Sequence, residues 1–120
     1  MIQTSYFSSK APRERKVSIA KWPPRNWKGP QANQLAPTDP RASDWAAAYR
    51  RDLLIRFPMP SDLRRYLEEW ESKVPDPIFC CYEADANQCH RRVLAAFIQE
   101  QLNWHVPEWG SSRQQQASLF

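Results

Sequence analysis

Hydrophobic and polar positions divide this chain into short blocks, and the blocks predict strands on either side of a helical middle. Residues 1–7 and 16–22 are rich in Ile, Val, Tyr, Phe and Thr, as short strands are. Residues 78–83 (IFCCYE) form a near-continuous apolar run, which is typical of a buried central strand. Residues 103–109 predict a last short strand or extended segment.

Three stretches predict helices. The first has a cap at Ser43 and runs to about Phe57, ahead of a proline. The second has a cap at Ser61 and an apolar stripe at positions i, i+3, i+4 and i+7. The third follows Asp85, which has a glutamine three residues later, the layout of an N-terminal cap. Because strands and helices alternate in the second half, we expect one small α/β domain over residues 1–109. Its sheet should be short and mostly parallel, with flanking helices in two or three layers.

A long loop at residues 21–41 interrupts this alternation. Its prolines and glycine exclude a helix or a central strand over most of its length. About ten residues separate the first two strands, which leaves no room for a full crossover helix.

Composition adds limits to this picture. The 120 residues, 42% of them hydrophobic, suit a single domain with a modest core that needs neither metal nor disulfide. The sequence has no long apolar run and no signal-peptide pattern. We therefore expect a soluble, cytoplasmic protein that does not contact membranes.

Positive charge is concentrated in the first half of the chain. Ten of the 17 Lys and Arg residues lie between Lys10 and Arg51, in a chain of net charge +4. Such a distribution favours a polyanionic partner, nucleic acid or a nucleotide, and a solvated surface is the alternative.

Within the loop, basic residues alternate with tryptophans: Lys21, Trp22, Arg25, Trp27 and Lys28. Basic side chains follow phosphates, and exposed indoles give bases a stacking surface. In the alternative, both indoles fill the small core.

The cysteines gather around the third predicted strand. Cys80, Cys81 and Cys89 are odd in number and closely spaced, which argues against a secreted disulfide framework. We expect thiols that are structural, catalytic or metal-ligating. Because side chains alternate along a strand, Cys81 and Glu83 should share a face at the strand's carboxyl end, where open α/β sheets bind ligands.

The following turn brings further reactive groups to that end of the sheet. Cys89, His90 and Arg91 should lie in the first turns of the third helix, whose free N–H groups favour anions and thiolates. If the protein is an enzyme, we expect Arg91 to bind phosphate and Glu83 or His90 to act as general acid or base. Cys89 or Cys81 would be the nucleophile. The alternatives are cysteines that pack in the core, a capping histidine and a solvated arginine.

A zinc site would need three or four ligands, and Cys81, Cys89 and His90 supply three. Their spacing matches no usual zinc motif, so we predict no metal and no other cofactor.

Several short motifs resemble one family in the same order along the chain. They are TSYF, VSIA followed by two prolines, LAP, and CYE followed six residues later by CHR. Together they resemble the bacterial and phage family called domain of unknown function 488, over residues 4 to about 98. The resemblance implies a compact α/β fold with shared polar residues near the strand ends, and it implies no reaction. The matching positions are Thr4, Ser5, Tyr6, Ser18, Pro23, Gly29, Cys81, Glu83, Cys89, His90 and Arg91. From it we expect Thr4, Ser5, Tyr6 and Ser18 to contribute to ligand binding.

Residues 110–120 predict a flexible tail. Gln116, Ser118, Leu119 and Phe120 resemble the peptide with which bacterial polymerases and repair proteins dock on the replicative sliding clamp, although Ala117 is a weaker second residue. In that pattern the glutamine makes a directional hydrogen bond, and Leu–Phe fills an apolar pocket.

These observations support three hypotheses. The first is a DNA-associated protein of replication or repair, tethered to the clamp, that engages nucleic acid or a nucleotide at the CYE…CHR pocket. The second is a non-enzymatic protein that captures a small nucleotide, as a phage protein could do to sequester a signal molecule. The third is a clamp-docking adaptor with no active site. The sequence does not identify the reaction or the oligomeric state, and it does not show whether the nucleic acid is DNA or RNA.

Overall fold

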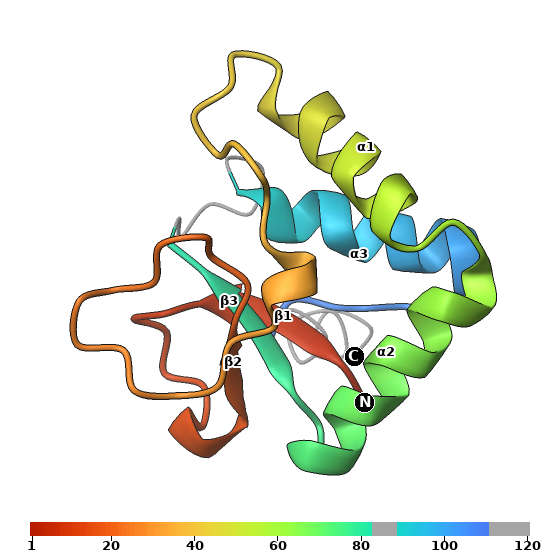
Figure 1. The fold of residues 1–120 in the computed structure, drawn as a ribbon. Coiled ribbons are helices and arrows are strands. Elements are labelled where there is room, and N and C mark those ends of the chain that lie inside the picture. The colour runs from red at the N-terminus through yellow and green to blue at the C-terminus, as the bar shows by residue number, and fades with distance from the viewer. Residues whose placement is uncertain (83–88, 111–120) are drawn as a thin grey trace, which may run out of the picture.

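A computed structural model describes residues 1–82 and 89–110 of the chain. A three-stranded sheet lies beside α-helices that come from the middle and the second half of the sequence (Figure 1). The strands are β1 (Gln3–Tyr6), β2 (Lys16–Ser18) and β3 (Ile78–Cys81). The α-helices are α1 (Trp45–Arg56), α2 (Pro60–Lys73) and α3 (His90–Leu102), and short 3-10 turns cover Arg13–Arg15 and Asn33–Leu35.

The sheet is parallel and has the order β1-β3-β2, which confirms the expected small α/β fold. Every residue of β3 is buried, as its near-continuous apolar run predicts. In the central strand, Phe79 pairs with Thr4 of β1 and with Val17 of β2. The carboxyl ends of all three strands therefore meet at one edge of the sheet.

Strand β2 is shorter than the predicted strand at 16–22. The Ser18 hydroxyl accepts a hydrogen bond from the Ala20 amide at 3.2 Å, so this amide bonds to a side chain of its own segment and not to a neighbouring strand. The predicted strand at 103–109 is reduced to one parallel bridge beside β1, between Glu108 and Thr4.

The starts of the first two α-helices differ from the predicted ones by one or two residues. Asp44, not Ser43, precedes α1. Helix α2 begins at Pro60, and the Asp62 carboxylate accepts a hydrogen bond from the Met59 amide at 3.1 Å. Proline suits the first helical position because the N–H of that position has no partner within the helix, so a residue without an N–H loses no hydrogen bond there.

The third helix begins at His90, with Cys89 at the N-cap position. The predicted cap at Asp85 is therefore wrong by four residues, and Asp85 itself lies outside the described residues.

The two faces of the sheet are covered differently. Phe79 and Cys81 belong to the main core together with buried residues from all three helices. Ile78 and Cys80 alternate to the other face, where Ala11 and the half-buried rings of Phe7 and Trp109 cover them. The helices thus form a second layer on one face of the sheet. Among the described residues, no helix is long and apolar enough to cross a membrane.

Candidate functional site

A pocket of about 400 Å³ opens where the parallel strands end. Its walls come from the loop after β2, the start of α1, the residue after β3 and the start of α3. The lining residues are Ala20, Lys21, Trp22, Pro37, Pro40, Arg41, Trp45, Tyr49, Tyr82, Cys89 and His90. The carboxyl edge of an open α/β sheet is where such folds bind ligands, and this volume lies within the range of small-molecule sites.

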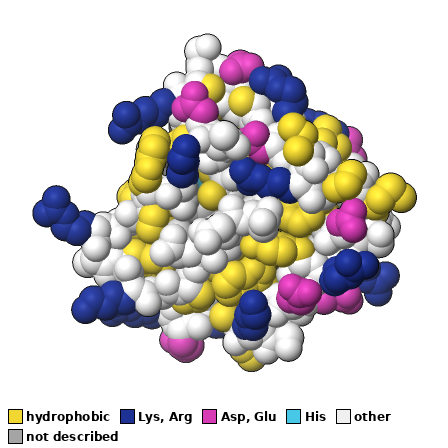
Figure 2. Space-filling view, viewed as in Figure 1, with side chains coloured by type: hydrophobic (Ala, Val, Ile, Leu, Met, Phe, Trp, Pro, Cys, Tyr) yellow, Lys and Arg dark blue, Asp and Glu magenta, His cyan; other side chains and the backbone are white. Residues whose placement is uncertain are grey.

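One wall of the pocket is an exposed aromatic ring that has two cations close to it. Trp22 is 51% exposed, and its ring centroid lies 5.2 Å from Lys21 Nζ and 5.0 Å from Arg41 Cζ. Tyr82, also 51% exposed, donates its hydroxyl hydrogen to the Trp22 carbonyl and so holds the loop against the end of β3. In Figure 2, Lys and Arg side chains stand out mostly around the edge of the face shown.

The second loop tryptophan has a structural role. Trp27 packs against Phe7 with ring centroids 5.1 Å apart, and its Nε1 donates to the Pro30 carbonyl at 3.3 Å. A Cβ at Gly29 would lie 2.6 Å from the Trp27 ring, so glycine permits this close packing. Of the two alternatives for the loop tryptophans, exposure therefore holds for Trp22 and packing for Trp27. The basic residues Arg25 and Lys28 are exposed and do not line the pocket.

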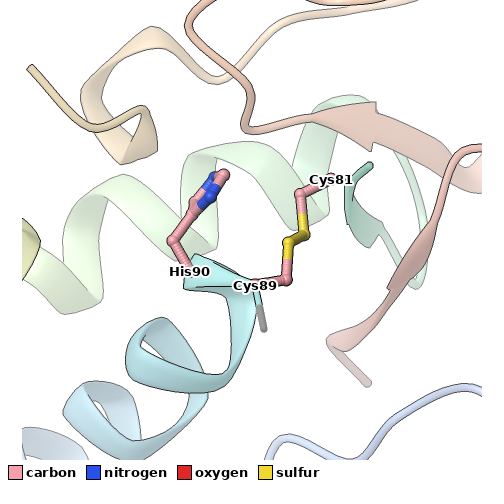
Figure 3. A group of neighbouring side chains, drawn as sticks. All are labelled: Cys81, Cys89 and His90. Atoms are coloured by element: carbon pink, nitrogen blue, oxygen red, sulfur yellow. A yellow bond between two sulfur atoms is a disulfide. The ribbon is translucent and has the colours of Figure 1, made fainter. Parts of the chain in front are cut away.

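Cys81 and Cys89 form a disulfide between the end of β3 and the start of α3 (Figure 3). Their Cα atoms are 6.8 Å apart, and only eight positions separate them in the sequence. The expectation of thiols at both positions is therefore corrected. Pairing depends on the strand–turn–helix geometry, which cysteine spacing does not reveal. Cys80 is the free cysteine, and burial raises its pKa to about 12.

His90 is oriented by a backbone hydrogen bond. Its Nε2 lies 2.8 Å from the Ile19 carbonyl oxygen. Because a carbonyl only accepts, Nε2 carries the hydrogen, and Nδ1 keeps its lone pair. The ring meets Tyr49 edge-on at 5.1 Å, and burial lowers the pKa of His90, which favours the neutral imidazole. The Tyr49 hydroxyl donates to the Leu35 carbonyl at 2.6 Å, and burial raises its pKa.

Arg91 is fully buried and does not line the pocket. Its Nε donates to Glu108 Oε1 at 2.7 Å, and its Nη1 lies 3.2 Å from Cys81 Sγ. The same Glu108 oxygen accepts a hydrogen bond from Thr4 Oγ1 at 2.6 Å, and the Tyr6 ring lies 5.8 Å from the guanidinium carbon. Arg91 thus fastens the start of α3 to β1 and to the segment that follows α3. Phosphate binding by Arg91 stays a prediction, and this geometry favours a structural role instead.

Four further residues from the family resemblance do not line the pocket. Thr4, Ser5 and Ser18 are buried in the sheet, and Tyr6 is half-buried beside Arg91. Glu83, the predicted acid or base, lies outside the described residues. So do the predicted docking residues Gln116, Ser118, Leu119 and Phe120.

Sequence reasoning missed the other charged and aromatic lining residues, Arg41, Trp45, Tyr49 and Tyr82, and the small or apolar ones, Ala20, Pro37 and Pro40. Trp45 and Tyr49 lie four positions apart in α1 and therefore on the same face of the helix. Tyr49 belongs to the core, and both Trp45 and Tyr49 also line the pocket at the start of α1. For Tyr82, the usable signal is its place after the central strand, at the edge where ligands bind.

Comparison of the chain with family models, with curated proteins and with solved structures gives no match. The resemblance to domain of unknown function 488 therefore stays a prediction.

Proposed function

We propose that this protein binds a nucleic-acid strand or a nucleotide in the pocket at the carboxyl edge of its sheet. The observation that carries the proposal is the exposed Trp22 ring, with Lys21 and Arg41 beside it at a pocket of about 400 Å³. An exposed indole offers a stacking surface to any base, and the flanking cations suit the attached phosphates. Tyr82 adds a second exposed aromatic ring to the same pocket.

The two cations are expected to set the salt dependence of binding. In the double variant Lys21→Ala, Arg41→Ala, the affinity for a fluorescently labelled single-stranded oligonucleotide should fall. The slope of log K against log salt should become shallower by about 0.7 for each phosphate that the variant no longer neutralises. Fluorescence anisotropy at several salt concentrations measures both quantities.

Lys73 offers a matched control, because its Nζ lies 5.2 Å from the Trp70 ring and neither residue lines the pocket. Lys73→Ala should leave the slope within about 0.3 of the wild-type value, since a lysine away from the pocket neutralises no bound phosphate there. An unchanged slope in the double variant would contradict the proposal that Lys21 and Arg41 contact phosphates.

A single nucleotide is the alternative ligand for the same pocket, and the buried residues in its lining favour it. Tyr49 and Cys89 are buried although they line the pocket, so part of the pocket wall lies within the domain and not on its open surface. If the ligand is one nucleotide, a mononucleotide should displace the oligonucleotide fully, and affinity should not rise with oligonucleotide length. If the ligand is a strand, affinity should rise with length and mononucleotides should compete weakly.

We further propose, from the sequence pattern alone, that the tail tethers the protein to a bacterial sliding clamp in replication or repair. The supporting residues are Gln116, Ser118, Leu119 and Phe120. The variant Leu119→Ala, Phe120→Ala should lose a micromolar affinity for the clamp in isothermal titration calorimetry, because the apolar pocket of the clamp would stay empty. Arg113→Ala, outside the motif, is the matched control and should bind as the wild type does. Equal clamp binding by both variants would rule out docking by this motif. Oligonucleotide binding by the domain would be unaffected in either case.

A further inference from the structure

We propose that Cys81, Cys89 and His90 bind a zinc ion when their disulfide is reduced, with the fourth coordination position open toward the pocket. One donor atom from each side chain lies within 4.8 Å of the other two. Figure 3 shows the three side chains together at the junction of β3 and α3. The site extends beyond the proposed function, because it requires no nucleotide.

The donor set fits zinc. Two thiolates and an imidazole are soft and intermediate ligands, which select Zn²⁺ over Mg²⁺ or Ca²⁺. Within the described residues three side chains converge, and three protein ligands plus a water molecule are the usual arrangement of reactive zinc sites. Cys89 and His90 also line the pocket, so a water or ligand atom in the fourth position would face that space.

The hydrogen bond of His90 prepares its other nitrogen for a metal. Ile19 accepts from Nε2 at 2.8 Å, and this contact fixes the tautomer in which Nδ1 is the free donor. Metal-ligating histidines characteristically donate their second ring N–H to a carbonyl or a carboxylate in this way. The accepting carbonyl belongs to Ile19, the residue that directly follows β2, so the sheet fixes its position.

The cysteine side of the site is prepared as well. Arg91 Nη1 lies 3.2 Å from Cys81 Sγ, so a buried N–H points at one proposed ligand atom. The charge of Arg91 is offset by Glu108, whose carboxylate its Nε contacts at 2.7 Å. Two buried thiolates would therefore need a further positive charge, and a divalent cation supplies it.

The oxidised and metal-bound states exclude each other. Reduction by a dithiol transfers two electrons and two protons to the Cys81–Cys89 disulfide, and the dithiol becomes a disulfide. Zn²⁺ then replaces the two thiol protons and accepts the lone pair of His90 Nδ1, releasing two protons in total. Reoxidation by a disulfide or peroxide oxidant would expel the ion.

The test is a zinc titration of the full chain, first reduced and stripped with a chelator, in competition with a chromophoric zinc indicator. We expect one ion per chain, and none after reoxidation. The variants Cys89→Ser and His90→Ala should bind zinc at least about 100-fold more weakly, since even outer partners of a metal site contribute 10- to 100-fold. Matched controls are Cys80→Ser, on the opposite face of β3, and His105→Ala, an exposed histidine.

A second readout uses the wild-type chain alone and does not depend on folded variants. Zinc should slow the alkylation of Cys81 and Cys89, as mass spectrometry of the peptides would show. Cobalt in place of zinc should give a thiolate charge-transfer band. The proposal is overturned if the reduced chain binds no zinc, if zinc leaves the alkylation rates of both cysteines unchanged, or if the controls lose zinc as the ligand variants do.

Discussion

Arg91→Ala is expected to lower the free energy of unfolding by about 1.5–3 kcal/mol, because it removes a fully buried guanidinium together with its charge-assisted hydrogen bond to Glu108. The guanidinium is fully buried and donates to Glu108 at 2.7 Å, and Thr4 uses the same carboxylate oxygen. Removing Arg91 would remove its link from the start of α3 through Glu108 to Thr4 of β1. Urea or thermal unfolding followed by circular dichroism measures the loss.

The adjacent Arg92 provides the matched control, since it occupies the next position of α3 and is exposed. Arg92→Ala should change stability by no more than about 0.5 kcal/mol. Similar losses of stability in the two variants would contradict the structural role of Arg91. If Arg91→Ala stays folded but no longer binds the oligonucleotide, phosphate binding by Arg91 would hold instead.

Trp22→Ala is expected to weaken nucleotide or oligonucleotide binding by about 1–3 kcal/mol, roughly 5- to 150-fold, the usual contribution of one stacked base. Because the side chain is 51% exposed, stability should change by no more than about 0.5 kcal/mol. Trp22→Phe should recover much of the affinity, since a phenyl ring still stacks. Anisotropy titration and thermal unfolding separate the two effects.

Trp27→Ala is the control within the same loop. Trp27 packs against Phe7 and does not line the pocket, so its removal should reduce stability and spare binding in the folded fraction. Equal reductions of binding in the Trp22 and Trp27 variants would mean that the loop acts through its overall shape. Stacking on Trp22 would then be rejected.

The fold could be predicted from the sequence because its strongest patterns are local. The apolar run that contains β3 and the apolar stripe of α2 are both visible in the order of neighbouring residues. The structure buries the side chains of β3 and the stripe positions Leu63 and Leu67 of α2, as these patterns predict. Strand order depends on pairing between distant segments. The apolar run predicted that β3 would be a central strand, but no local pattern indicated that its neighbours would be β1 and β2 and not the predicted strand at 103–109.

The candidate site was only partly predictable, for the same reason. The segment around Cys89 and His90 was identified because it follows a buried strand and opens a helix. The role of Arg91 depends on Glu108, which lies 17 positions later and reaches the site only because its segment runs beside β1. The Cys81–Cys89 disulfide likewise depends on where the helix begins relative to the strand.

Trp22 and Trp27 illustrate the limit within a single loop. Both have basic neighbours in the sequence, yet one is exposed at the pocket and the other packs beside Gly29. The difference comes from Phe7, whose ring is available to Trp27 because β1 ends next to that part of the loop.

Photocrosslinking tests nucleotide binding at the pocket most directly. A single-stranded oligonucleotide carrying 5-bromodeoxyuridine would be irradiated with the full chain, and the crosslinked peptides would be mapped by mass spectrometry. We expect crosslinks at Trp22 or Tyr82, the exposed rings of the pocket, and we expect excess unlabelled oligonucleotide to remove them. Crosslinks confined to other exposed segments, or none at concentrations that saturate binding, would contradict the proposal that this pocket binds nucleic acid.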